Sequence, residues 1–211
     1  MPTGPLETFL YALVALLVIF DPAGTAALLV ALTPQDTQAE RTAQAVRASA
    51  IALVVLALFG LAGEGLLRAL GIGLPAMQVA GGILLFLTAA DMVTARGALR
   101  ATPEEQEVAT RTNEDISVFP LAIPLLAGPG AMTTMVLLRS AAGGDWSRVA
   151  ALEAALCAAL GATLVAMLLA GHVKRLLGDT GTHVIGRVLG VLLAALAAQI
   201  AMDGVRAALR N

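Results

Sequence analysis

The sequence predicts an all-α, polytopic membrane protein whose six transmembrane helices form two inverted three-helix repeats. Of its 211 residues, 58% are hydrophobic and only 13% are charged, whereas a soluble domain has roughly 45–50% apolar and about 25% charged residues. The apolar residues gather in blocks of about twenty, the length that a helix needs to cross roughly 30 Å of hydrocarbon. A Pro-Gly break that recurs in both halves of the chain predicts the repeat.

Six hydrophobic blocks follow one another along the chain. They are Leu6–Leu32, Val46–Leu67, Leu74–Thr94, Ile116–Leu138, Val149–Gly171 and Val184–Ala207. We interpret the first block as a retained helix, because Met1 to Thr8 lacks the Lys or Arg of a signal peptide. Polar connections separate the blocks, such as "HVKRLLGDTGT" between the fifth and the sixth. An acidic loop at about 97–115 divides the single domain, 1–211, into repeats at about 5–96 and 116–208.

The first and fourth blocks are interrupted by helix breakers, in "FDPAGTAALLVALT" and in "PLAIPLLAGPGAMTT". Proline removes a backbone donor and clashes with the preceding turn. In hydrocarbon, irregular backbone persists only where it faces protein or a water-filled cavity. The freed amides of a half-helix form a positive pole that suits a carboxylate. Either break alone could be a packing kink, but two breaks in equivalent positions favour a transporter binding site.

The candidate binding residues cluster at these two breaks. They are Asp21, Pro22, Gly24 and Thr25 at the first, Gly128, Pro129, Gly130, Ala131, Thr133 and Thr134 at the second, and Arg187 in the sixth block. A carboxylate at bilayer depth is functional by default, and an Asp before Pro also suits a helix cap. The two roles of Asp21 are compatible. Arg187 either snorkels to the interface or pairs with a carboxylate. We interpret Asp91 and Asp203, near the ends of their blocks, as residues that reach the interface.

Several classes of function are disfavoured. The chain has no G-x-S-x-G, H-E-x-x-H or P-loop motif, so we predict no catalytic residues, no bound metal and no cofactor. A net charge of −2 without a basic run argues against a nucleic-acid partner.

The distribution of Lys and Arg predicts the orientation of the protein in the membrane. The loops that follow the first, third and fifth blocks contain seven of these residues, whereas the opposite face contains five. This excess predicts both termini outside the cytoplasm.

The motifs resemble those of the MarC family of six-helix inner-membrane proteins. The resemblance rests on "DPAG" in the first span and "PLAIPLLAGPGAMTT" in the fourth, and extends to "LPAMQVAGGILLFLTAADM" and "IGRVLGVLLAALAAQIAMDGV". It implies two inverted repeats in a bacterial or archaeal cytoplasmic membrane, transport of small neutral amino acids, and a distant similarity to LysE-type exporters. The family usually shows Gly-Asn and a further Pro after the first break, where this chain has Gly24 followed by Thr25.

The leading hypothesis is therefore a secondary transporter of glycine- or alanine-like zwitterions. The substrate carboxylate would rest on the amides after Pro129, with Thr133 or Thr134 assisting, and Asp21 or freed carbonyls would receive the ammonium or a coupling cation. H⁺ and Na⁺ are the candidate coupling ions, and the lipid bilayer and a small solute are the expected partners. A homo-oligomer is left open. The alternatives are a non-transporting scaffold or assembly protein and an intramembrane enzyme, for which the sequence shows no nucleophile–base pair.

Overall fold

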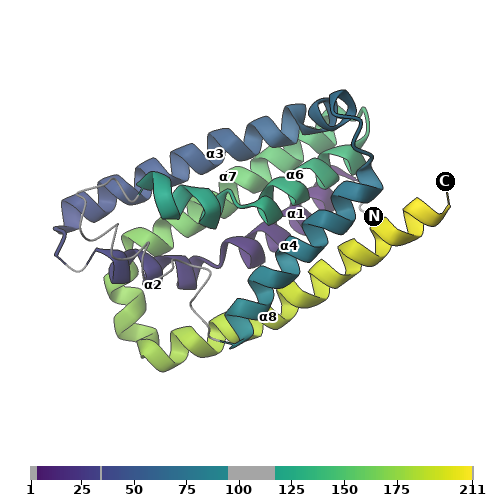
Figure 1. The fold of residues 1–211 in the computed structure, drawn as a ribbon. Helices are drawn as coiled ribbons and strands as arrows, with labels where there is room; N and C mark the ends of the chain where they lie inside the picture. Colours follow the sequence, from purple (N-terminus) through teal and green to yellow (C-terminus); the bar gives the residue numbers. More distant parts are fainter. Residues whose placement is uncertain (1–3, 34, 95–116, 211) are drawn as a thin grey trace.

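A computed structural model describes residues 4–33, 35–94 and 117–210, and every regular element within them is helical. The elements are α1 (Pro5–Phe20), α2 (Pro22–Leu32), α3 (Gln38–Ala69), α4 (Leu74–Thr94), the π-helix η2 (Ser117–Leu126), α6 (Pro129–Ala142), α7 (Trp146–Leu168) and α8 (Ala170–Leu209) (Figure 1). The all-α prediction is confirmed for these residues. The predicted acidic loop, 97–115, lies outside the described residues.

Five helical spans in the described part of the chain are long and apolar enough to cross a membrane. They are Pro5–Leu32, which joins α1 and α2, then Gln38–Ala69, Leu74–Thr94, Trp146–Leu168 and Val184–Leu209. The predicted count of six is not confirmed, because the fourth block is divided between η2 and α6. These segments have only 10 and 14 residues, and a helix needs about 20 to span the bilayer.

The connection between the fifth and sixth blocks differs from the prediction. The stretch expected as a polar loop is helical, because α8 begins at Ala170 and continues without interruption to Leu209. Helix α7 ends at Leu168, three residues before the predicted end of the fifth block. The stretch contains no proline and includes Lys174, Arg175 and two leucines, residues with high helix propensity. Charge marks a segment as polar but does not prevent it from being helical.

The helices form an elongated bundle with both terminal helix ends at one end of its long axis (Figure 1). At that end the guanidinium Nε of Arg148 in α7 lies 3.4 Å from the hydroxyl of Thr8 in α1. Helix α1 packs against α7, α3 packs against η2, α6 and α7, and α4 packs against α8. Fully buried side chains at the centre of the bundle come from several helices, for example Leu16, Phe20, Leu56, Met135 and Leu156. The central position of α1 and α6 places both breaks inside the protein.

Helices α4 and α8 are antiparallel and approach closely at glycines. A Cβ built on Gly82 would lie 2.8 Å from Ala201, and one on Gly190 would lie 2.8 Å from Met92. Near the other end of the interface, a Cβ on Gly204 would lie 2.8 Å from the Pro75 carbonyl oxygen. As residue numbers rise in α4 they fall in α8. Small residues at such contacts let membrane helices pack backbone to backbone.

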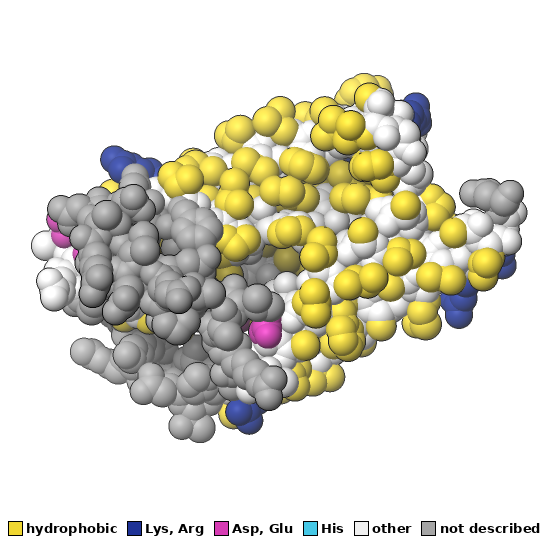
Figure 2. Space-filling model, in the orientation of Figure 1, with side chains coloured by type: hydrophobic (Ala, Val, Ile, Leu, Met, Phe, Trp, Pro, Cys, Tyr) yellow, Lys and Arg dark blue, Asp and Glu magenta, His cyan; other side chains and the backbone are white. Residues whose placement is uncertain are grey.

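Large apolar side chains cover the outside of the bundle. Exposed residues include Leu10, Val54, Leu58, Phe86 and Val191, each about half exposed or more. Figure 2 shows hydrophobic side chains across the middle of one face, with Lys and Arg toward its ends. An apolar surface of this extent is costly in water and is stable against lipid tails. The charge distribution is that of a bundle whose long axis crosses the bilayer.

Candidate functional site

The first break lies at Asp21, between α1 and α2. Asp21 has φ 44° and ψ 72°, in the left-handed region. Its Oδ1 accepts a hydrogen bond from the Gly24 amide at 3.1 Å, and Pro22 follows at the first helical position. The side chain is only 2% exposed. Asp and Asn visit the left-handed region more readily than other residues with a side chain, and Asp is a preferred N-cap. The capping role predicted for Asp21 is thus present in the structure.

Backbone groups freed at the first break find partners locally. The Asp21 amide donates to the Leu17 carbonyl at 3.1 Å, and the Thr25 hydroxyl donates to the Phe20 carbonyl at 2.6 Å. This local pairing lets a helix change direction in hydrocarbon without leaving polar groups unsatisfied. Pro22, Gly24 and Thr25 form the first turn of α2.

The second break joins η2 to α6 through Ala127 and Gly128. The Ala127 amide donates to the Ala122 carbonyl at 2.8 Å, a bond across five residues that is typical of a π-helix. There is no room for a side chain at residue 128, because a Cβ on Gly128 would lie 2.2 Å from the Pro124 carbonyl oxygen. Helix α6 then begins at Pro129. Glycine is the residue that permits this approach of two backbone segments.

The beginning of α6 provides hydrogen-bond donors. The amide of Met132 already donates to the Gly128 carbonyl at 3.0 Å. Because α6 starts at Pro129, the amides of Gly130 and Ala131 have no intrahelical carbonyl to bind. Together with the helix dipole they form a partial positive charge at the break.

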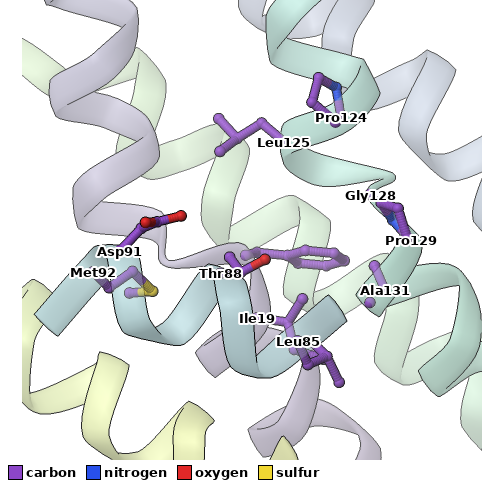
Figure 3. Close-up of a pocket in the computed structure, with 12 residues that line it drawn as sticks. Ile19, Leu85, Thr88, Asp91, Met92, Pro124, Leu125, Gly128, Pro129 and Ala131 are labelled. Atoms are coloured by element: carbon purple, nitrogen blue, oxygen red, sulfur yellow. The ribbon is translucent and has the colours of Figure 1, made fainter. Parts of the chain in front are cut away.

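A pocket of about 130 Å³ lies between the two breaks. Ile19 and Phe20, the last residues of α1, line one part of it, and Gly128 to Ala131 line another. Pro124 and Leu125 of η2 also line it, and helix α4 contributes Leu85, Thr88, Asp91 and Met92. Figure 3 shows Thr88 and Asp91 on the α4 side, opposite Gly128 and Pro129. The pocket therefore has a carboxylate on one side and helix-start amides on the other.

This arrangement suits a small molecule that carries both charges. The amides of Gly130 and Ala131 can donate to a carboxylate or another anionic group. Asp91 can accept from an ammonium group on the opposite side. A cavity of roughly 150 Å³ can hold a molecule as large as benzene, so a pocket of about 130 Å³ has room for a small solute.

Some of the predicted site residues lie away from this pocket. Asp21, Pro22, Gly24 and Thr25 hold the first break together but do not line the pocket. The Thr133 hydroxyl donates to the Pro129 carbonyl at 2.8 Å. Thr134 lines a different cavity. Arg187 is exposed and lines neither cavity, so the structure does not bring it together with the breaks.

Thr88 and Asp91 were missed as pocket residues by sequence reasoning. We interpreted Asp91 as a residue that reaches the interface because it stands near the end of its block. The available signal was the i, i+3 spacing of Thr88 and Asp91, which places them on one face of a helix. Among the described residues, no three His, Cys, Asp or Glu side chains gather closely enough to hold a metal ion.

Comparison with known proteins places the chain in a family. Residues 6–209 match the model of the MarC family integral membrane proteins. The chain belongs to the MarC family. It is 34% identical over 203 residues to a UPF0056 membrane protein of Aquifex aeolicus, covering 96% of this chain and 94% of that protein. It is also 34% identical over 197 residues to the UPF0056 inner membrane protein YhgN of Escherichia coli K12, covering 92% and 94%. No solved structure matches the chain.

Membership of the MarC family confirms the resemblance derived from the motifs. A relative in the archaeon Methanocaldococcus jannaschii, also named a UPF0056 membrane protein, is 34% identical over 97% of this chain. The protein is thus an integral, multi-pass membrane protein, in agreement with its apolar surface and helical spans.

Proposed function

We propose that the protein is a secondary membrane transporter of small neutral amino acids such as glycine and alanine. The observation that carries the proposal is the pocket lined by the last residues of α1 and the first residues of α6, the two interrupted segments. In transporters, substrates bind where broken helices from two repeats meet near the middle of the membrane. A kinked helix that served packing alone would not require a pocket with a carboxylate in its lining at the kink.

Binding in the pocket would use one group for each charge of the substrate. The carboxylate would accept hydrogen bonds from the amides of Gly130 and Ala131, as predicted from the second break. The ammonium group would face Asp91, which lines the pocket. Asp21 would keep the first break in shape through its bond to Gly24. The residue that receives the ammonium is thus revised from Asp21 to Asp91.

The helix contacts support two inverted three-helix repeats. If the first repeat contains the α1–α2 span, α3 and α4, the second contains η2 with α6, then α7 and α8. Exchange of the repeats turns the contact of α1 with α7 into that of η2 with α3, and the contact of α2 with α7 into that of α6 with α3. All four contacts are present. The same exchange maps the α4–α8 contact onto itself, as expected for an antiparallel pair about a two-fold axis.

Orientation and coupling are further predictions of this proposal. The Lys and Arg distribution favours an orientation with both termini outside the cytoplasm, in a bacterial or archaeal inner membrane. H⁺ or Na⁺ would drive transport. Glycosylation or thiol tags at the termini of the inserted protein test the orientation, and flux under imposed H⁺ or Na⁺ gradients tests the coupling.

Counterflow of labelled glycine and alanine in proteoliposomes tests the substrate. We expect saturable flux with the unaltered protein, and the same flux with Asp145→Asn. In Asp91→Asn the flux should fall by a factor of about ten or more, because a charge-assisted bond contributes about 1.5–3 kcal/mol. Asp145 is an exposed carboxylate outside the pocket and serves as the matched control. Undiminished flux in Asp91→Asn would exclude the ammonium role. Absence of glycine and alanine flux in correctly inserted protein would exclude these substrates and favour the scaffold alternative.

A further inference from the structure

A second cavity, of about 230 Å³, is formed by α1, α4, α6 and α8. Its polar lining residues are Tyr11 of α1, Gln78 of α4, Thr134 of α6, and Gln199 and Asp203 of α8. Leucines and alanines of α6 and α8 supply much of the remaining surface. The cavity shares α1, α4 and α6 with the pocket between the breaks but no lining residue.

The Thr134 hydroxyl distinguishes this cavity from an ordinary packing gap. Each of the other buried threonines in the described part of the chain donates its hydroxyl to a carbonyl four or five residues earlier. These are Thr8, Thr25, Thr33, Thr133 and Thr163. Thr134 is 4% exposed, and among the described residues its hydroxyl oxygen has no hydrogen-bond partner. Thr134 lines the cavity, and an unsatisfied buried hydroxyl costs free energy, so a polar occupant that could reach this hydroxyl would be favoured there.

The two cavities lie on opposite sides of the contact between α4 and α6. Along α4, Gln78 lines the second cavity, Gly81 to Leu85 meet α6, and Leu85 to Met92 line the pocket between the breaks. Along α6 the order is reversed, with Gly128 to Ala131 in that pocket and Thr134 to Ala141 in the second cavity.

The barrier between them consists of the pairs Gly130–Leu85 and Gly81–Thr133. A Cβ on Gly130 would lie 2.3 Å from Leu85 Cδ2, and one on Gly81 would lie 2.0 Å from Thr133 Cγ2. Such close approach leaves no space for a solute at the contact. A solute could pass between the two cavities only if α4 and α6 moved apart.

The polar groups of the second cavity carry little net charge and therefore suit a solute without net charge. The Asp203 carboxylate accepts from the Gln199 side-chain amide at 3.0 Å and from the Arg206 guanidinium at 3.4 Å. Its negative charge is thereby balanced before any solute arrives. The groups that remain for binding are hydroxyl and amide, which are donors and acceptors without net charge. They suit a small polar or zwitterionic molecule better than an anion.

We propose that this cavity is a second binding chamber for the transported amino acid, open toward the membrane face at which α1 begins and α8 ends. The pocket between the breaks is then accessible from the opposite membrane face, and the α4–α6 contact is the barrier that opens during transport. Thr134 and Gln78 bind the solute in the second chamber. The inference rests on the proposed transport function and extends it to a path with two chambers.

Sided cysteine labelling tests the path without depending on the solute. Cys157, exposed on α7, is first replaced by Ser, and Thr134→Cys, Thr88→Cys or Thr163→Cys is then introduced singly. A membrane-impermeant, positively charged thiosulfonate is applied to vesicles of either orientation. We expect Thr134→Cys to react from the face that carries Pro5 and Leu209, Thr88→Cys to react from the opposite face, and the control Thr163→Cys to stay unmodified. Thr134→Cys that reacts from neither face, or from the Thr88 face alone, would overturn the two-chamber path.

Isosteric substitution then tests the binding role. Thr134→Val removes the hydroxyl at nearly constant volume, and we expect about a 2- to 10-fold rise in the half-saturation concentration for alanine. Thr134→Ser should restore it, and Thr163→Val should leave it unchanged. Normal alanine flux with an unaffected half-saturation concentration in Thr134→Val would refute the second chamber while leaving the proposed function intact. If alanine flux is absent but labelling is two-sided, the chambers stand and the proposed substrate fails.

Discussion

Replacement of Asp21 by Ala should destabilise the protein by more than the loss of one hydrogen bond. Asp21 has φ 44° and its Oδ1 caps α2 through the Gly24 amide. An alanine held in the left-handed region costs about 1–2 kcal/mol, and loss of an N-cap costs typically about 1 kcal/mol. The sum is about 2–3 kcal/mol. Asn tolerates the same backbone conformation and also presents a carbonyl oxygen to Gly24, so Asp21→Asn should retain most of this stability.

The comparison between Asp21→Ala and Asp21→Asn isolates these two contributions. Both variants remove the buried charge, so its desolvation cost cancels in the difference. The free energy of unfolding can be measured for each variant in mixed micelles as the mole fraction of denaturing detergent is raised, with circular dichroism as the signal. We expect Asp21→Ala to be less stable than Asp21→Asn by about 2–3 kcal/mol. Equal stabilities within about 0.5 kcal/mol would show that neither the cap nor the backbone conformation holds the first break.

Two further predictions concern other local features. Gly128→Ala should lower the stability in the same assay by about 1–3 kcal/mol, because its Cβ would meet the Pro124 carbonyl oxygen at 2.2 Å, while Gly161→Ala, with open space around it, should be neutral or stabilising. Equal effects of the two would contradict the geometry of the second break. Hydrogen bonds from the Ser147 hydroxyl and amide hold the pKa of Asp145 below its ordinary range. The cap of α7 should therefore stabilise the protein above the ordinary carboxyl pKa and weaken as the pH falls through the lowered pKa. Asp145→Ala should lose this acid dependence, and an unchanged pH profile would refute it.

The features that the sequence predicted well are those encoded in short stretches. Membrane insertion follows from blocks of apolar residues, because hydrocarbon excludes charge and requires paired backbone groups. The first break follows from Asp21 and Pro22, since an N-cap and a proline at the first helical position act within a few residues. The polar stretch after α7 was misjudged because a helix there keeps its backbone bonds internally whatever its side chains.

Long-range geometry decided what the sequence left open. Thr133 and Thr134 are neighbours in the chain, yet one turns its hydroxyl back to the Pro129 carbonyl and the other faces the second cavity. Asp91 entered the pocket because α4 packs beside the second break, a contact between segments about forty residues apart. The sequence by itself determined that the protein resides in a membrane and where its helices break. Only the tertiary structure decided which side chains meet at those breaks, because helix packing, rather than local propensity, selects the inward face of each helix.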